Sequence, residues 1–585
     1  MTTYSPSLSA VELAPAATPV EAGTPGETGP VRDLAAQPEL GTAEPQVGAS
    51  RAPAPRSVPM LPAVTPLRVS SLVHLDWGGQ FRSRNEAIGG VRVNSDNALL
   101  PTHMDFRHAS ADKPGLPTDG RLYSADVRLR LEPTIAVGDW STIGVQLDAL
   151  GLLGSAPITS DLGQRFAAGA LGQGALGSGL AVRRVWLQVQ LQDLGAIEIG
   201  KMADHFGLGM VRNRGGGLDE DHQSDVDRVK IRTELFGIRG AIGRNNLASL
   251  PLVPEGGALA NYNNAVAAQF GGTTAKPYLL GTGNTGLPLQ DSTDVIRWDF
   301  EAGGGKLVNN RGFLWDLALL WQSQDLALVS ETVAANEHLS PLTKLNDPTC
   351  GTNCGVLSHR GLRLWTFQGA VDWRGSVLGS PLTLQAEAAF QYGSIARTDI
   401  TAAADGKTIA AAGVAAKAAW QRGRSTWLLD LGAASGETEG GFGVNDTTNF
   451  KVGGVPDGAG RPLLTGFRFH RSYRVDGLLF RDLIGAVANA YYVRPAWRTA
   501  RPLTCTFALS AEVGVLGAAA MFGGATPGKS QVLGLEPDLT IGLDTDRTRG
   551  QLRGSLVVPG AAFANGAGTP ADAAWRLDLI WQLRF

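Results

Sequence analysis

The chain of 585 residues is long enough for several globular domains or for one large barrel. Hydrophobic residues make up 43% of it, yet no apolar run reaches the ~18 residues of a membrane-spanning helix, which excludes such a helix. The formal net charge is −3, and no cluster of Arg and Lys is interleaved with aromatic residues, so a nucleic-acid-binding protein is not predicted.

Residues 1–66 are rich in Pro, Ala, Gly, Glu and Thr and have no hydrophobic periodicity. Such a segment cannot bury enough apolar surface to offset its ordering entropy, which predicts a disordered tail. The first residues lack the basic stretch and apolar core of a secretory signal, so export is expected to need an upstream start or a cleaved leader. The predicted folded domain is residues 67–585.

The main body of the chain alternates apolar and polar residues in many short stretches. In RLYSADVRLRLE, Tyr123, Val127 and Leu129 fall on one face of a strand, and Asp126 and Arg128 fall on the other. Each stretch has the length that a tilted strand needs to cross a bilayer, and long and short connections alternate. This pattern predicts an all-β fold, a closed antiparallel transmembrane β-barrel of about 18 strands, with about 16 as the second choice because two stretches are weak.

The polar face of these strands carries Asp, Glu, Arg and Gln with little Lys, and many charges lie in mid-strand. Charges are expected there if they face a hydrated lumen, whereas a soluble sandwich would accept any polar residue on its surface. Trp and Tyr residues near strand ends are typical of an aromatic girdle. The residues predicted to line the pore are Asp126, Arg128, Arg130, Glu132, Asp148, Arg228, Lys230, Arg232, Arg297, Asp299, Glu301, Glu387, Asp430, Glu512, Glu536 and Asp538.

A segment between two predicted strands, residues 197–232, is rich in glycine and then in acidic residues. Such a loop can fold into the lumen, where charged groups set the selectivity of a pore. A solvated extracellular loop is the alternative, and a calcium site is a weaker one because the spacing does not match an EF-hand. The acidic residues of the predicted constriction loop are Asp219, Glu220, Asp221, Asp225 and Asp227.

Two of the three cysteines, Cys350 and Cys354, lie in the turn-rich stretch DPTCGTNCG. A pair with this spacing and no second Cys or His pair nearby is a poor zinc site. The pattern favours a small disulfide in an oxidising compartment over two unpaired loop thiols. Neither a metal nor a cofactor is predicted.

Residues 467–495 also interrupt the strand pattern. Apolar residues from Leu479 to Ile484 have helical spacing, which predicts a short amphipathic helix near 474–484 that leads into a strand. This helix either narrows the mouth of the pore or packs on its rim. Further along, GGATPGKS has the spacing of a phosphate-binding loop, but a strand and not a helix follows, so a strand-to-strand turn is expected.

The chain ends in AAWRLDLIWQLRF, where apolar and mostly polar residues alternate up to a final phenylalanine. This ending resembles the last strand of outer-membrane proteins, which the barrel-assembly machinery reads. The resemblance implies an assembly signal formed by Trp575, Leu577, Leu579, Trp581, Leu583 and Phe585.

Two segments resemble a little-characterised family of predicted outer-membrane barrels, found mainly in myxobacteria and their relatives. The family pattern is a strand followed by G-R-M-P-S-H-W-G-L-G and an acidic stretch ending in D-R; here it reads GKMADHFGLG from Gly200, closed by Asp227 and Arg228. The stretch from Phe467 to Arg481 is also similar. The resemblance implies a barrel over residues 67–585 and implies no substrate, and the strand layout is similar to alginate-export porins at the level of fold.

The function that the sequence favours is a porin-like channel for passive passage of small polar solutes across the bacterial outer membrane, with both chain ends in the periplasm. The predicted partners are outer-membrane lipid, the barrel-assembly machinery and these solutes. A non-conducting structural or adhesive barrel, whose loops bind external partners, is the first alternative. An outer-membrane hydrolase ranks last, because no G-x-S-x-G or H-E-x-x-H motif occurs, and no enzyme is predicted. The oligomeric state stays open.

Overall fold

The computed structural model describes residues 73–93, 104–106, 121–150, 180–191, 194–217, 219–220, 223–248, 295–329, 356–396, 406–438, 463–504, 507–565 and 568–585. The tail predicted over residues 1–66 and the cysteines Cys350 and Cys354 lie outside these residues. None of the helices within them is long and apolar enough to cross a membrane.

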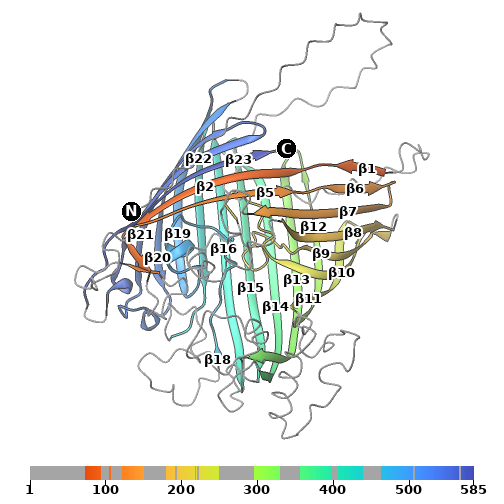
Figure 1. The fold of residues 1–585 in the computed structure, drawn as a ribbon, viewed down its shortest axis with the longest axis horizontal. Helices are drawn as coiled ribbons and strands as arrows, with labels where there is room; N and C mark the ends of the chain where they lie inside the picture. The colour runs from red at the N-terminus through yellow and green to blue at the C-terminus, as the bar shows by residue number, and fades with distance from the viewer. Residues whose placement is uncertain are drawn as a thin grey trace, which may run out of the picture. The chain divides into compact units, whose positions relative to one another are not determined.

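The described residues form one large sheet of 21 strands, in which β1, β6 and β18 are short additions and the other 18 form a closed ring (Figure 1). Every neighbour in the ring is antiparallel, and β2 pairs with β23 over residues 80–89 and 575–584, which closes it. The prediction of an 18-stranded antiparallel barrel is therefore confirmed. The ring strands are β2 (Gly79–Gly89), β5 (Leu122–Leu131), β7 (Ser141–Leu150), β8 (Leu180–Gln190), β9 (Ala196–Ala203), β10 (Asp225–Leu235), β11 (Ile238–Ala248), β12 (Val295–Val308), β13 (Arg311–Val329), β14 (Val356–Val377), β15 (Ser380–Ile395), β16 (Lys407–Arg422), β17 (Ser425–Ala434), β19 (Ala490–Pro502), β20 (Ala508–Ala520), β21 (Val532–Asp544), β22 (Thr548–Pro559) and β23 (Ala574–Arg584).

The additional strands extend or line the ring. β1 (Val73–Asp76) pairs with β6 (Thr134–Val137), and β6 pairs with β7, so the two continue β2 and β5 at one end of the barrel. Pro133 lies at the break between β5 and β6, where a missing backbone N–H is tolerated. β18 (Leu463–Leu464) runs parallel to β16, and β3 (Val91–Val93) pairs with β4 (Met104–Phe106) in a separate small sheet.

Short and long connections alternate around the ring, as predicted. At one end, β10–β11, β12–β13, β14–β15 and β16–β17 are each joined by two residues, and we call this the short-turn end. The connections at the other end include residues 204–224 and 435–489. The two stretches with weak alternation in the sequence, residues 237–245 and 484–497, contain most of β11 and the start of β19. The described start of the chain and Phe585 both lie at the short-turn end, where Gly79 and Phe585 exchange two backbone hydrogen bonds.

The two faces of the barrel wall differ in polarity. In β23, Leu577, Leu579 and Trp581 point outward and are 46–53% exposed, while Arg576 and Asp578 point inward and are 2% exposed. The same alternation recurs along the other strands because successive side chains of a strand point to opposite faces. The apolar residues thus face outward and the charged residues face the interior, which is the arrangement of a membrane barrel and not of a soluble sandwich.

Residues 466–489 do not form the amphipathic helix predicted near 474–484. They hold a single π-helical turn, η5 (Leu479–Leu483), and β19 begins only at Ala490. All residues of η5 are buried. The segment packs inside the barrel against inner-face residues such as Ile88, Leu516 and Val557. The helical spacing of its apolar residues was misleading, because the segment is enclosed on every side and has no single buried face.

The connection that contains GGATPGKS joins β20 directly to β21 and holds only the short 3-10 turn η6 (Gly523–Ala525). A strand follows it, so the helix N-terminus that a phosphate-binding loop requires is missing there. The expected strand-to-strand turn is confirmed.

Candidate functional site

Two stretches of the chain occupy the interior of the barrel. We call the described residues 204–217, 219–220 and 223–224, between β9 and β10, the first inner segment, and residues 466–489, between β18 and β19, the second inner segment. The two are joined by a backbone hydrogen bond from the N–H of His470 to the carbonyl of Met210, 2.6 Å long. Together with the inner face of the wall, they form the candidate functional site.

Asp204 holds the first inner segment to the strands β10 and β12. Its carboxylate lies 2.7 Å from Nη2 of Arg228 and 2.5 Å from Nη2 of Arg297. Arg212, from the same segment, approaches it to 3.1 Å and also reaches Glu301 at 2.9 Å. Asp204 is 1% exposed, and a buried charge of this kind requires such partners.

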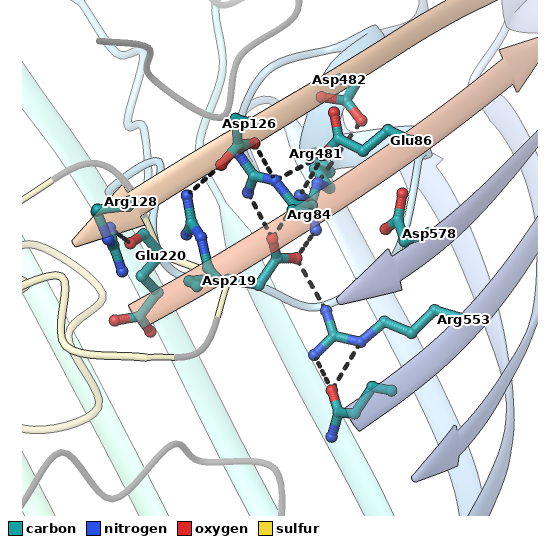
Figure 2. Close-up of polar contacts among 12 residues, drawn as sticks. Arg84, Glu86, Asp126, Arg128, Asp219, Glu220, Arg481, Asp482, Arg553 and Asp578 are labelled. Carbon is teal, nitrogen blue, oxygen red and sulfur yellow. Dashed lines mark hydrogen bonds and ion pairs between the residues drawn. The ribbon is translucent and has the colours of Figure 1, made fainter. Parts of the chain in front are cut away.

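Asp219 is the point at which both inner segments and the wall meet. Figure 2 shows its carboxylate among Arg84 of β2, Arg481 of the second inner segment and Arg553 of β22. Oδ1 is 2.7 Å from Nη1 of Arg84 and 2.8 Å from Nη2 of Arg481, and Oδ2 is 2.8 Å from Nη1 of Arg553. Asp219, one of the acids considered for calcium, is thus surrounded by guanidinium groups. Among the described residues, no group of three or more His, Cys, Asp and Glu side chains is placed to hold a metal ion.

The network continues across the β2–β23 closure. Glu86 accepts a hydrogen bond from Nη2 of Arg576 at 2.6 Å, and Arg576 also contacts Asp482 of the second inner segment. On the other side of Arg84, its Nε donates to Asp126 of β5 at 2.7 Å. The charged groups from β2, β5, β22 and β23 therefore fix both inner segments to one arc of the wall.

Two carboxylates of the wall bind backbone N–H groups of the inner segments. Glu536 of β21 accepts from the N–H groups of Gly477, Leu478 and Leu479 at 2.8–2.9 Å. Gly477 is required for this approach, because a Cβ atom there would lie 1.9 Å from the Oγ atom of Ser555. Glu387 of β15 accepts from the N–H of Met210 at 3.1 Å. Each inner segment thus has a carboxylate acceptor from the wall for backbone groups that would otherwise be buried without a partner.

His470 lies in the second inner segment with a neutral ring. Its Nδ1 accepts a hydrogen bond from the N–H of Ser472 at 3.1 Å, which requires that nitrogen to be unprotonated. Burial lowers the pKa of His470 to about 4, and the positive charges of Arg474 and Arg471 act in the same direction.

Farther around the wall, a second group of charges remains partly open to the interior. Arg494 of β19 reaches Glu512 at 3.0 Å and Asp538 at 3.2 Å, and Arg498 reaches Glu512 at 2.5 Å. On the opposite arc, Arg232 of β10 pairs with Glu198 at 3.1 Å, and its side chain is 36% exposed.

The residues predicted to line the pore lie at inner-facing positions of the ring strands, except Glu132, and the inner segments cover many of them. Asp299, Glu387 and Glu536 are at most 1% exposed. Lys230, Glu301, Asp430 and Glu512 are only partly buried, and Glu132, next to β5, is exposed. Their role in lining a pore stays a prediction.

The predicted constriction loop needs a correction. Asp219 and Glu220 lie in the first inner segment, but Asp225 and Asp227 belong to β10. Asp225 pairs with Arg184 at 2.6 Å, and Asp227 lies opposite Lys201 on the exposed outer face. The acidic run crosses the loop boundary, so that only its first members lie in the loop and its last two lie in a strand. Asp221 lies outside the described residues.

Several charged residues of the site were not predicted. Most belong to strands whose alternation was visible, in QFRSRNEA, QLRGSLVV and AAWRLDL, while Asp204, Arg481 and Asp482 lie in the inner segments. Alternation places the strand residues on the inner face but does not pair residues far apart in the chain. The unpredicted residues are Arg82, Arg84, Glu86, Asp204, Arg481, Asp482, Arg553, Arg576 and Asp578.

No family model matches the chain, and no curated protein matches it. Among solved structures, the chain is similar to the outer membrane protein OpdK from Pseudomonas aeruginosa, with 10% identity over 87% of this chain and 99% of that chain and a TM-score of 0.40. It is also similar to OccK9 (OpdG) from the same organism, with 11% identity, coverage of 87% and 99%, and a TM-score of 0.41. OmpT, an outer membrane protein of Vibrio cholerae, has 8% identity, coverage of 88% and 98%, and a TM-score of 0.35. The fold of this chain, a closed antiparallel barrel of 18 strands, is established by its own strand pairing.

Proposed function

We propose that the chain spans the bacterial outer membrane as a porin-like channel for passive passage of small polar solutes. The observation that supports this most strongly is the closed barrel with an apolar outer face and a charged inner face. A closed ring leaves no strand edge unpaired in lipid, and an inner face of this charge density is expected next to water or other polar groups.

In this proposal the two inner segments narrow the lumen and shape its electrostatics. They cover the arc formed by β2, β5, β22 and β23, where Asp219 and Asp482 bind wall arginines. Solutes then pass beside the charges that stay partly exposed, among them Arg232 and Glu512. Charges of both signs around such a passage attract ions and set their selectivity.

Both chain ends are periplasmic in this proposal, since the described start and Phe585 share the short-turn end and short turns face the periplasm in such barrels. The assembly machinery then reads β23, in which Leu577, Leu579 and Trp581 point outward. We also propose that the chain is related to the predicted myxobacterial barrels and has a strand layout like that of alginate-export porins. The folded domain begins at residue 67 in this proposal.

A non-conducting structural or adhesive barrel is the second candidate. The apolar residues of the second inner segment favour it, since Phe467, Leu478 and Ile484 are at most 2% exposed and pack in the interior. A fully packed interior would block solutes and leave the long loops as the functional surface.

Single-channel recording in planar bilayers separates the two candidates. We expect discrete conductance steps for the wild-type barrel, and a reversal-potential shift toward cation selectivity in Arg232→Ala, which removes a partly exposed inner cation. Lys201→Ala is the matched control, because it removes one positive charge from the outer face. A barrel that is folded and inserted but shows no steps supports the non-conducting candidate.

A further inference from the structure

Two turns at the short-turn end carry large apolar residues at their tips. We propose that Phe236 and Leu378 insert their side chains into the interfacial layer of the periplasmic lipid leaflet and anchor the barrel at that depth. This inference rests on the membrane placement given under the proposed function and adds a specific lipid contact to it.

The backbone of both turns disfavours the residues found there. Phe236 and Gly237 have φ angles of 53° and 75°, and Leu378 and Gly379 have 53° and 76°. Two positive φ angles in a two-residue hairpin are the mark of a type I′ turn, in which Asn, Asp or Gly is preferred. A bulky residue is rare in this region because its Cβ crowds the following carbonyl. The requirements of the turn therefore do not explain Phe236 and Leu378.

A third turn of the same kind shows the ordinary solution. Asn309 and Asn310 join β12 to β13 with φ angles of 48° and 59°. This turn lies between the two apolar ones in strand order, and it forms the same tight connection with residues that tolerate the conformation. Polar residues also join β21 to β22, at 545–547. Apolar tips are thus a feature of particular turns and not of the architecture.

Neither side chain is buried against the protein. Phe236 is 96% exposed and Leu378 is 90% exposed. The outer face next to Phe236 is apolar up to the tip, since Leu235 and Ile238 are also more than half exposed. Val377 continues the wall in the same way beside Leu378. The tips therefore extend the lipid-facing surface, on which the small side chains of Thr233 and Ser380 are the nearest polar groups.

Lipid is the occupant that this continuity favours. Phe and Leu side chains gain free energy when they leave water for the apolar edge of the headgroup layer. A gain of that kind offsets the unfavourable backbone conformation. A separate protein partner would need a surface that also contacts the lipid-facing wall beside the tips.

The contact is tested by placing 4-fluorophenylalanine at position 236 and measuring its fluorine relaxation in liposomes of phosphatidylethanolamine and phosphatidylglycerol. Dissolved oxygen concentrates in lipid, whereas a nickel chelate stays in water. We expect oxygen to relax the label about fivefold more than the chelate does, as at the edge of the apolar layer. The same label at position 367, on the outward face of β14, reports the lipid-facing wall, and the free labelled amino acid in the buffer reports water.

The labels separate the possible failures. If the label at 367 is shielded from nickel while the label at 236 is not, this inference is overturned and the membrane placement stands. If the label at 367 also meets the chelate, the membrane placement fails as well. If neither reagent reaches position 236, a protein covers the tip and the inference is again wrong.

A second variant tests the energetic argument. Replacing both residues, Phe236→Asn with Leu378→Asn, relieves the backbone conformation while it removes the apolar side chains. We expect this variant to unfold in urea about threefold faster than wild type when it is embedded in the same liposomes, because it loses the lipid contact. Equal or slower unfolding would show that the side chains contribute nothing beyond the turn.

Discussion

The two inner segments fill the same barrel by different means. The first is held by charge, since Asp204, Arg212 and Asp219 each form two or more ion pairs. The second is held mostly by apolar packing, since Phe469, Leu479 and Leu483 of this segment are at most 1% exposed. Each also gives backbone N–H groups to one carboxylate of the wall.

The interior of the barrel is therefore a folded core in which ion pairs stabilise one segment and apolar packing stabilises the other. Loss of an apolar side chain leaves a cavity whose cost depends on volume, whereas loss of one ion-pair partner leaves a buried charge without compensation. The variants below act on one segment at a time, and hydrogen exchange of the backbone amides reports which segment responds.

The largest effect is expected for Phe469→Ala. This side chain packs edge-on against Phe467 and Tyr473 at centroid distances of 6.0 and 5.3 Å. Its removal should destabilise the second inner segment by about 4 kcal/mol. Amides 466–489 should then exchange much faster while the first inner segment changes little. Phe367→Ala, on the outer face, is the control, and equal exchange in both inner segments would contradict separate stabilisation.

A somewhat smaller effect is expected for Asp204→Asn. The change removes one negative charge from among Arg212, Arg228 and Arg297, which stay buried. We expect the free energy of unfolding of the first inner segment to fall by about 3 kcal/mol. Hydrogen exchange should accelerate in residues 204–217 and not in 466–489. Added salt should not reproduce the effect, because buried pairs are poorly screened; a salt effect of similar size would show that the pairs are exposed to solvent.

Glu536→Gln is expected to act more weakly. The carboxamide keeps one oxygen, so the three N–H groups from Gly477 to Leu479 share fewer acceptor sites. We expect the free energy of unfolding of the second inner segment to fall by about 2 kcal/mol. The amide hydrogens of these residues should then exchange faster. Glu512→Gln is the matched control, because Glu512 binds arginine side chains and not this backbone. Unchanged protection of Leu478 and Leu479 would rule out Glu536 as the anchor.

The smallest expected effect is the fall in stability at acid pH that His470 causes. The pKa in the folded chain is about 4, below the ordinary 6.5, so the unfolded chain binds more protons between these values. Stability is therefore complete above pH ~6.5 and falls as the pH drops toward ~4, by about 1 kcal/mol after allowance for partial exposure. His470→Asn keeps an acceptor for the Ser472 N–H and should flatten this dependence. A variant with the same slope as wild type would assign the acid sensitivity elsewhere.

The sequence predicts the barrel wall well because a strand with two different faces leaves a period of two in the chain. Strand number, alternating connections and the outward face of β23 all follow from that period. The first inner segment was anticipated from its glycines and acids, although Asp227 proved to lie on the outer face of β10.

The interior contacts lie beyond such reasoning, because they join residues far apart in the chain. Asp219 and Arg553 are separated by 334 positions, and nothing in either neighbourhood specifies the other. The prediction of an amphipathic helix near residues 474–484 was wrong for a related reason. A fully enclosed segment needs no single apolar face. Which inner charges are covered depends on these long-range contacts.

The meeting of the first and last ring strands has a consequence for biosynthesis. Arg576 of β23 contacts Glu86 of β2 and Asp482 of the second inner segment. β23 is synthesised after both β2 and the second inner segment, so these contacts form only once the chain has been made as far as Arg576. A product that stops before β23 leaves β2 and β22 unpaired on that side, and its second inner segment lacks the contact with Arg576. We expect cellular proteases to cleave such a product readily.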